Sequence, residues 1–217
     1  LAWLAGNPRG LLLGILLPAL VLRLLAAILN LGYFAVDDYT VLSNAIPVQL
    51  SVALHSQHGQ LNLGGLAGVE DIRNPLPQML VFGVAWLAHQ FGAENALNQV
   101  RAVFAAMGLI SMISIVCGWR ILAIAGRMQQ AAVAGLLLGF HWLQPFFSTR
   151  SMIENMAAPF IMLALLQLSQ YWIAGRRRSL FYSMIWLALA AMLRFQAGIL
   201  ILCYPLLLYQ RKDWKGF

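Results

Sequence analysis

Charged side chains are scarce in this sequence of 217 residues. Only 10% of the residues are Asp, Glu, Lys or Arg, and just 7 are acidic. A soluble globular domain carries about 25% charged residues, so this composition excludes an ordinary soluble protein. Cysteine is nearly absent as well, since Cys117 and Cys203 are the two that occur and both lie inside apolar stretches. Such a pair excludes a disulfide framework and implies no cysteine-ligated metal.

Several familiar catalytic patterns are also missing. The sequence contains no Gly-x-Ser-x-Gly nucleophile elbow, no phosphate-binding loop of the Walker type and no His-Glu-x-x-His zinc pattern. His55 and His58 have the i, i+3 spacing of a metal-binding pair, but no third ligand accompanies them. We therefore predict no metal site and no resident cofactor.

Long apolar runs are what the sequence does contain. Hydrophobic residues make up 61% of the chain, and the mean hydropathy is +0.77. Runs of about 20 residues can cross a bilayer as helices, and the short alternating segments of a membrane barrel are missing. We predict an all-α integral membrane protein with about six transmembrane helices. The predicted spans cover residues 10–32, 99–119, 129–147, 156–174, 179–193 and 196–210.

The net charge of +7 comes from basic residues between the apolar runs, which indicates membrane topology rather than nucleic-acid binding. If residues 78–91 lie on the membrane surface, nine cations share the inner face: Arg9, Arg120, Arg127, Arg176, Arg177, Arg178, Arg211, Lys212 and Lys215. If residues 78–91 cross instead, Arg9 is separated from the other eight. The positive-inside rule favours the first arrangement.

We therefore predict one transmembrane domain over residues 1–217, with three parts. Residues 10–32 form the first span, residues 35–98 form a long outer loop with interfacial amphipathic helices, and residues 99–210 hold the remaining spans. Because the chain begins at Leu1 and not at methionine, we expect it to be a piece of a longer protein.

This topology gathers acids and arginines at the outer face. The members are Asp37, Asp38, Glu70, Asp71, Arg73, Arg101, Arg150, Glu154 and Arg194, with His55 and His58 between them. Such a cluster fits a polar reaction site at a membrane interface, and it fits structural ion pairs between helix ends equally well.

For individual residues of this cluster, both a functional role and a structural role remain open. Asp38 is either a helix N-cap or part of a catalytic base. Glu154 is either a site residue or a structural residue that caps a helix or pairs with Arg150 at helical i, i+4 spacing. Arg73 is either a ligand of a phosphate or the partner of a nearby acid. Arg23, inside the first span, pairs with a carboxylate or helps to neutralise a lipid phosphate.

The adjacent carboxylates Asp37 and Asp38 suggest the chemistry of sugar transfer from a lipid phosphate. Such a transfer needs a carboxylate that takes the proton of the acceptor hydroxyl, and cations that hold the phosphate leaving group. Arginine suits the second task because its planar fork binds two phosphate oxygens at once.

Four segments in this order resemble the GT-C membrane glycosyltransferases, in particular the polyprenyl-phosphate-mannose-dependent mannosyltransferases. They are residues 36–39 (Val-Asp-Asp-Tyr), 71–77 (Asp-Ile-Arg-Asn-Pro-Leu-Pro), 148–154 (Ser-Thr-Arg-Ser-Met-Ile-Glu) and 193–196 (Leu-Arg-Phe-Gln). The resemblance implies inverting transfer of a sugar from a polyprenyl-phosphate donor to a lipid-linked or glycan acceptor. It also implies a periplasmic or lumenal active face, in a bacterial inner membrane or an endoplasmic reticulum.

The resemblance further implies that Asp37 or Asp38 is the general base and that no metal is required. Arg73, Arg150 and Arg194 are the expected donor-phosphate ligands, and Glu154, His55 and His58 are expected to support them. The expected partners are membrane lipids, the lipid-linked sugar donor and other membrane subunits, without nucleic acid. The alternative is a non-catalytic membrane subunit of a larger complex, which the short chain favours. A transporter or channel fits least, because paired repeats are missing.

Overall fold

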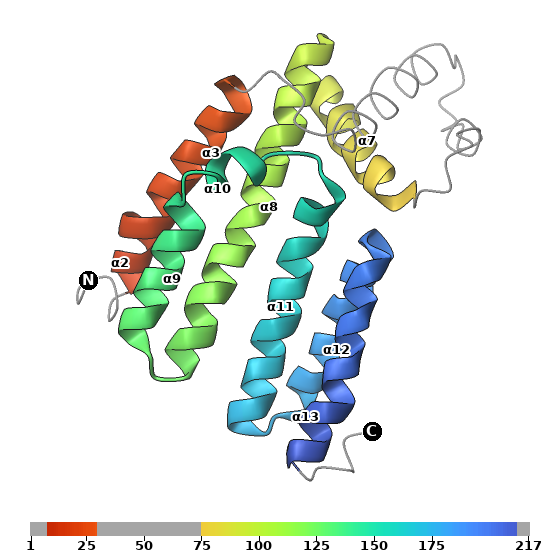
Figure 1. The fold of residues 1–217 in the computed structure, drawn as a ribbon. Coiled ribbons are helices and arrows are strands. Elements are labelled where there is room, and N and C mark those ends of the chain that lie inside the picture. The colour runs from red at the N-terminus through yellow and green to blue at the C-terminus, as the bar shows by residue number, and fades with distance from the viewer. Residues whose placement is uncertain (1–7, 30–74, 212–217) are drawn as a thin grey trace.

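The computed structural model describes residues 8–29 and 75–211, and the regular structure in these ranges is entirely helical (Figure 1). The elements are α2 (Pro8–Leu11), the π-helical turn η1 (Leu12–Leu16), α3 (Leu17–Leu29), α7 (Pro75–Gln90), α8 (Ala96–Ile124), α9 (Met128–Phe140), α10 (Gln144–Phe147), α11 (Ile153–Ala174), α12 (Arg177–Leu193), the 3-10 helix η3 (Phe195–Leu202) and α13 (Cys203–Arg211). The predicted all-α class is confirmed for this part of the chain.

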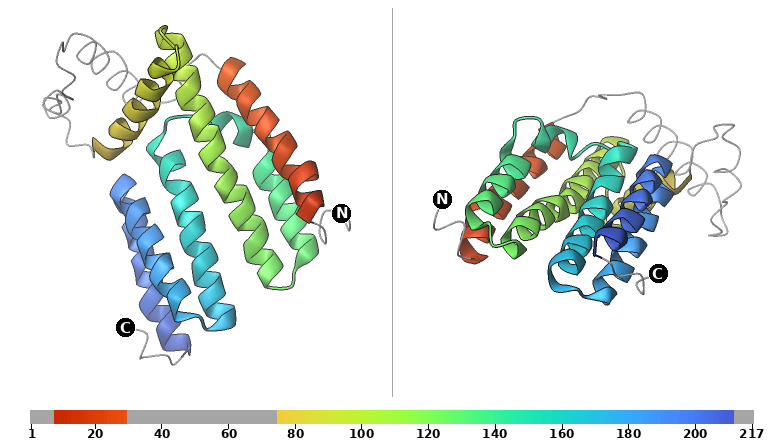
Figure 2. Two further views of the ribbon diagram at one scale, coloured as in Figure 1. Left: turned by 180° about the vertical axis from the view of Figure 1, so that it is seen from behind. Right: turned by 60° about the horizontal axis from the view of Figure 1, so that its bottom comes forward.

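The long helices lie side by side and run up and down, with α8 at the centre of the array (Figures 1 and 2). α8 packs against α3, α7, α9 and α11, and α11 packs in turn against α12. α7 is joined to the start of α8 by a short turn, and its Val81 and Ala85 are buried with Val103 and Phe104 of α8. Within the range 35–98, which was predicted to be an outer loop, residues 75–90 form α7, and residues 35–74 lie outside the described ranges.

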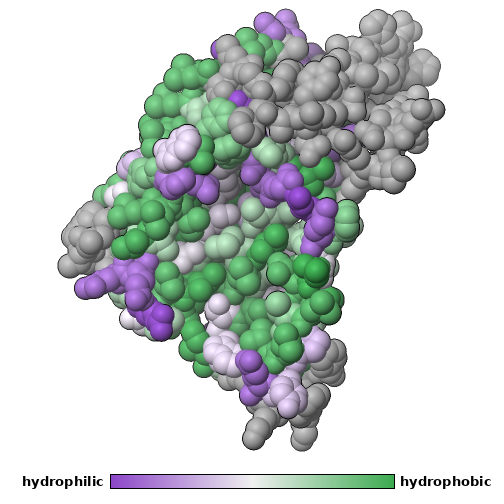
Figure 3. Space-filling view, in the orientation of Figure 1, coloured by the Kyte–Doolittle hydropathy of each residue, from purple (hydrophilic) through white to green (hydrophobic). Residues whose placement is uncertain are grey.

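The outer surface of the helices is strongly apolar (Figure 3). Large side chains such as Leu17, Leu29 and Leu137 are exposed, and such a surface is costly in water but suited to lipid. Among the described helices, Leu97–Ile124 and Ile153–Ala174 are long and apolar enough to cross a membrane. Leu13–Leu29, Met128–Phe140 and Phe195–Gln210 are shorter apolar helices.

Two predicted helix boundaries have contrasting outcomes. The single helix predicted over residues 129–147 ends at Phe140, and a separate short helix, α10, follows it. Pro145 stands at the start of α10, where a proline is tolerated because the first turn needs no backbone donor. The predicted break at Arg194 is confirmed, since this residue is extended (φ −138°, ψ 107°) between α12 and η3.

The two ends of the helix array carry different kinds of charged and polar residues. The turns around Gly126 (φ +75°) and Gly175 (φ +67°) lie at one end, which also carries Arg127 and Arg178. Both glycines adopt the left-handed conformation that ends a helix and that other residues rarely accept. We call this end the basic end, and the opposite end, where α10 meets α11, the polar end.

Arg23 is a fully buried arginine inside the bundle, 1% exposed. Its Nε donates a hydrogen bond to Ser111 Oγ at 2.9 Å, and Nη1 donates to the Ala19 carbonyl at 3.2 Å. Nη1 and Nη2 also donate to the carbonyls of Gly139 and Leu138, at 3.1 and 3.0 Å. These two carbonyls belong to the last turn of α9, where no backbone donor is available. Among the described residues, the partners of Arg23 are thus carbonyls and a hydroxyl, rather than the expected carboxylate.

Replacing Arg23 with methionine is expected to lower the free energy of unfolding by roughly 3 kcal/mol, because the two terminal carbonyls of α9 would stay buried without a donor. Ser111→Ala removes a single hydrogen bond, so we expect a loss of about 1 kcal/mol. Thermal unfolding of the purified protein in one detergent measures both. Equal losses for the two variants would contradict the capping role of Arg23.

Candidate functional site

A run of four polar residues is buried at the polar end, between α10 and α11. Ser148, Thr149, Arg150 and Ser151 are all at most 7% exposed. The Thr149 hydroxyl donates a hydrogen bond to the Phe146 carbonyl at 2.9 Å. Burial of consecutive polar side chains is costly unless they are bonded or serve a function, so this run is the first candidate for a site.

Asn155 holds the run against the start of α11. Its Nδ2 donates hydrogen bonds to the Phe147 carbonyl and, at 3.3 Å, to the Arg150 carbonyl. The backbone N–H of Arg150 donates to the Phe147 carbonyl at 3.0 Å. The backbone of Arg150 is therefore held from both sides, which restricts where its side chain can go.

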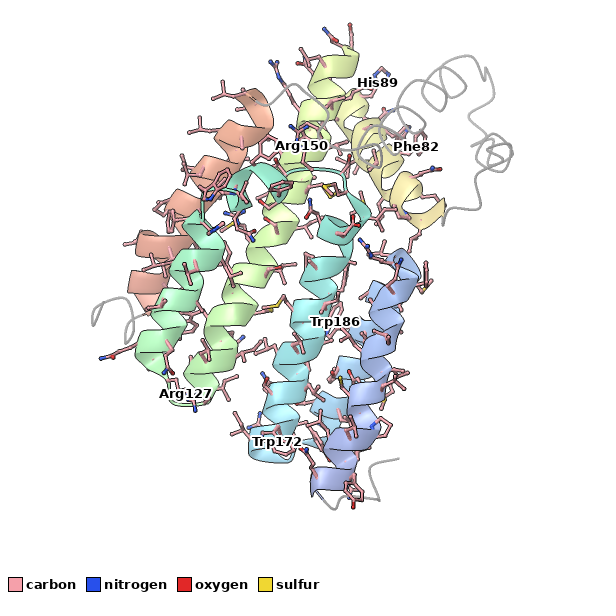
Figure 4. All side chains as sticks on the ribbon, in the orientation of Figure 1. Phe82, His89, Arg127, Arg150, Trp172 and Trp186 are labelled. Carbon is pink, nitrogen blue, oxygen red and sulfur yellow. The ribbon has the colours of Figure 1, made fainter. Side chains whose placement is uncertain are left out.

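The guanidinium of Arg150 lies between two aromatic rings. Its Cζ is 5.0 Å from the ring centroid of Phe104 on α8 and 4.7 Å from that of Phe146 on α10. Both distances fit cation–π contacts, which are strongest where the cation is shielded from water. The rings orient the guanidinium, and Figure 4 shows Arg150 near the top of the array, over α8 and beside α10.

Glu154 and Arg194 form an ion pair that joins α11 to the break between α12 and η3. Glu154 stands in the first turn of α11, where the helix dipole stabilises a negative charge. The pair is partly open to solvent, with 42% of the Glu154 side chain and 33% of the Arg194 side chain exposed. Glu154 Oε2 has no hydrogen-bond partner among the described groups, so it retains capacity to accept one.

This ion pair corrects one sequence-based interpretation. A pair between Arg150 and Glu154 was one reading of their i, i+4 spacing, but that spacing brings side chains together only within one helix. α11 begins at Ile153, so Arg150 precedes the helix. Glu154 instead meets Arg194, 40 residues later in the chain.

A small polar cavity of about 60 Å³ lies below the buried run, among α3, α8, α10 and α11. Its polar lining comes from Arg23, Ser111, Ser114, Gln144, Ser148 and Asn155. Ser148 Oγ is buried and has no hydrogen-bond partner among the described groups. A cavity of this size and polarity has room for ordered water, which would connect Arg23 to the segment that carries Arg150.

The profile of the Alg9-like mannosyltransferase family matches residues 68–217, which is most of the chain. The chain belongs to the Alg9-like mannosyltransferase family. This family is of the GT-C type and is membrane-associated, so the predicted family resemblance is confirmed. Comparison with curated proteins and with solved structures found no significant match. Membership of the Alg9-like family indicates a glycosyltransferase.

The part of the chain that matches the Alg9-like family contains four predicted site residues: Arg73, Arg150, Glu154 and Arg194. The structure pairs Glu154 with Arg194 and places both at the polar end with Arg150. The remaining predicted site residues, Asp37, Asp38, His55, His58 and Arg73, lie outside the described ranges. Within the described ranges, no three His, Cys, Asp or Glu side chains gather as a metal site requires.

Sequence reasoning missed the residues that hold the site of this Alg9-like chain in place. Phe104 lies in the first third of α8, where nothing in the sequence distinguishes it from other core residues, and its contact with Arg150 is tertiary. Asn155 carried a usable signal, because an amide in the first turn of an apolar helix usually bonds to nearby backbone.

Proposed function

We propose that this chain is an inverting, mannosyltransferase-like glycosyltransferase that uses a polyprenyl-phosphate sugar as its donor. The acceptor is a lipid-linked or glycan hydroxyl, and the reaction takes place at the polar end of the helix array. The single observation that carries the proposal is the buried guanidinium of Arg150, which two aromatic rings hold at that end in a chain of the Alg9-like family.

The transfer is a single displacement. The acceptor oxygen attacks the anomeric carbon while its proton moves to Asp37 or Asp38, and the bond from that carbon to the phosphate oxygen breaks. The phosphate leaves with the bonding electrons, so negative charge grows on its oxygens. A preorganised cation in a site shielded from water stabilises that charge best, and Arg150 has the burial and orientation that this role needs.

Arg150 and Arg194 are proposed to have different roles at the polar end. Arg194 pairs with Glu154 across the junction of α11 with the end of α12, and both side chains are partly open to solvent. Arg194 and Glu154 are therefore proposed to border the site and to hold α12 against α11. Arg73 is proposed as a further phosphate ligand and His55 and His58 as supporting residues, because they belong to the same predicted outer loop.

We propose six transmembrane passes, with the polar end facing the periplasm or the lumen. The distribution of charge supports this orientation, because the described residues at the basic end include Arg127, Arg176 and Arg178. The two described carboxylates, Glu94 and Glu154, both lie away from that end. Cytoplasmic segments of membrane proteins carry an excess of Lys and Arg.

The test is a sugar-transfer assay with the purified full chain in phospholipid vesicles. Radiolabelled mannose is supplied on polyprenyl phosphate in one arm and on a nucleotide in the other, with a mixture of lipid-linked oligosaccharides as acceptor. We expect transfer from the polyprenyl-phosphate donor with inversion at the anomeric carbon. Transfer from the nucleotide alone would contradict the donor assignment, and a folded chain without transfer from either would contradict the enzyme assignment.

A further inference from the structure

An apolar groove opens at the basic end, away from the proposed reaction site. It has a volume of about 450 Å³, within the range of small-molecule sites. α8, α11 and α13 line it, chiefly through Leu122, Leu165, Leu168, Trp172 and Leu207. In Figure 1, α8 and α11 lie side by side, and α13 lies at the same end as the turn that follows α11. Figure 3 shows a hollow in the outline of the molecule at the same place.

The rim of the groove carries a cation. Arg127 stands in the turn between α8 and α9, is exposed, and lines the groove. Figure 4 places it at the same end as Trp172, which comes from α11. Tryptophan is enriched at the depth of lipid headgroups, so Trp172 marks the level at which a headgroup would meet Arg127. Apart from Arg127 and Ser169, the lining residues are aliphatic or aromatic.

Among the described residues, the charged side chains around the groove are all positive. Arg120, Arg127, Arg176 and Arg178 are exposed near the ends of α8 and α11 or the start of α12. The two carboxylates in the described ranges, Glu94 and Glu154, lie at or toward the opposite end. A ligand that combines one anionic group with a long hydrocarbon chain therefore complements this surface, whereas a purely apolar helix would leave Arg127 without a counter-ion.

We propose that this groove binds one anionic phospholipid, with its phosphate at Arg127 and an acyl chain along Leu122, Leu165 and Leu168. The lipid would lie between α8, α11 and α13 at the basic end, so it serves as a structural partner of the bundle. The inference is independent of sugar transfer, because it concerns the basic end and uses no residue of the reaction site.

Native mass spectrometry of the purified full chain tests this inference, with 1-palmitoyl-2-oleoyl phosphatidylglycerol as the probe and the matching phosphatidylcholine as the neutral reference. We expect the parent protein to retain one phosphatidylglycerol in preference to phosphatidylcholine. Arg127→Gln is expected to reduce that preference about fivefold. This factor corresponds to the free energy that one cation contributes near an anionic membrane surface. Ala125→Trp, which places an indole in the groove, is expected to abolish the adduct.

Arg178→Gln is the matched control, because it removes one exposed cation from the same end without touching the groove. Equal losses for Arg127→Gln and Arg178→Gln would overturn the site and indicate general surface charge. A retained adduct in Ala125→Trp would overturn it too. A dimer in the parent protein that Ala125→Trp dissociates would show that a second copy of the chain, rather than a lipid, covers the groove.

A second measurement does not depend on bulky substitutions. Brominated phosphatidylglycerol quenches the fluorescence of a tryptophan that it contacts, and comparison with Trp172→Phe isolates the contribution of one indole among the 7 in the chain. We expect Trp172 to be quenched more strongly by brominated phosphatidylglycerol than by brominated phosphatidylcholine, and Arg127→Gln to remove the difference. Equal quenching by the two lipids in the parent protein would overturn the proposal.

Discussion

Replacing both Asp37 and Asp38 with asparagine is expected to slow sugar transfer roughly 10²- to 10⁴-fold, the contribution that a general base makes to catalysis. Asparagine has nearly the same size as aspartate but cannot accept the proton of the acceptor hydroxyl. The loss should therefore fall on kcat, while the KM for the donor changes little. The measurement is the transfer assay with polyprenyl-phosphate mannose, at saturating donor and acceptor.

The substitution by asparagine also separates the two readings of Asp38. Asparagine caps a helix about as well as aspartate does, so a residue that is merely a cap keeps both stability and activity when it becomes asparagine. A base keeps stability and loses activity. The single variants then identify the acting carboxylate, because the one that accepts the proton should reproduce most of the loss of the double variant.

Glu94→Gln is the control for the acidic pair. Glu94 is exposed in the turn between α7 and α8, outside the proposed machinery, and its substitution removes one carboxylate from the same chain. We expect normal transfer by this variant. Normal transfer by the folded Asp37→Asn/Asp38→Asn variant would instead remove the acidic pair from the mechanism and favour a structural role for it.

Composition and hydrophobic run length were sufficient to predict the helical class and most helix positions. The predicted break at Arg194 succeeded because a cation and Gln196 interrupt an apolar stretch that is otherwise long enough for one continuous helix. The prediction of one helix over residues 129–147 was wrong near its end. The mean hydropathy of this stretch stays high because it includes Trp142 and Phe146, so it does not reveal the turn between α9 and α10.

The partners of charged residues were much less predictable than the helices. Helical spacing suggested that Glu154 pairs with Arg150, yet its partner Arg194 comes from another helix pair. Arg23 was expected to pair with a carboxylate or to help neutralise a lipid phosphate. It donates to carbonyls at the end of α9, which are groups that every sequence contains and no motif marks. Tertiary contacts of this kind depend on how helices are arranged, which local patterns do not encode.

Arg150→Lys is expected to lower kcat/KM for the polyprenyl-phosphate donor roughly 10²-fold, the effect of losing one preorganised group that stabilises developing charge. Lysine keeps the positive charge but lacks the planar fork that binds two phosphate oxygens and stacks on Phe104 and Phe146. The loss should therefore reflect geometry rather than net charge. Steady-state kinetics with varied donor concentration measures it.

Because Arg150 is buried, this variant needs a readout that a purely structural role would not change. A ligand that binds the folded state raises the unfolding temperature, and the rise grows with the logarithm of the ligand concentration divided by its Kd. Polyprenyl phosphate without a sugar should thus stabilise the parent protein and fail to stabilise Arg150→Lys. Thr149→Val, which removes the hydroxyl bond to Phe146 but keeps the guanidinium, should retain the stabilisation by polyprenyl phosphate. If Arg150→Lys is stabilised as strongly as the parent, the guanidinium braces α8 against α10, and the donor phosphate must be held by other cations.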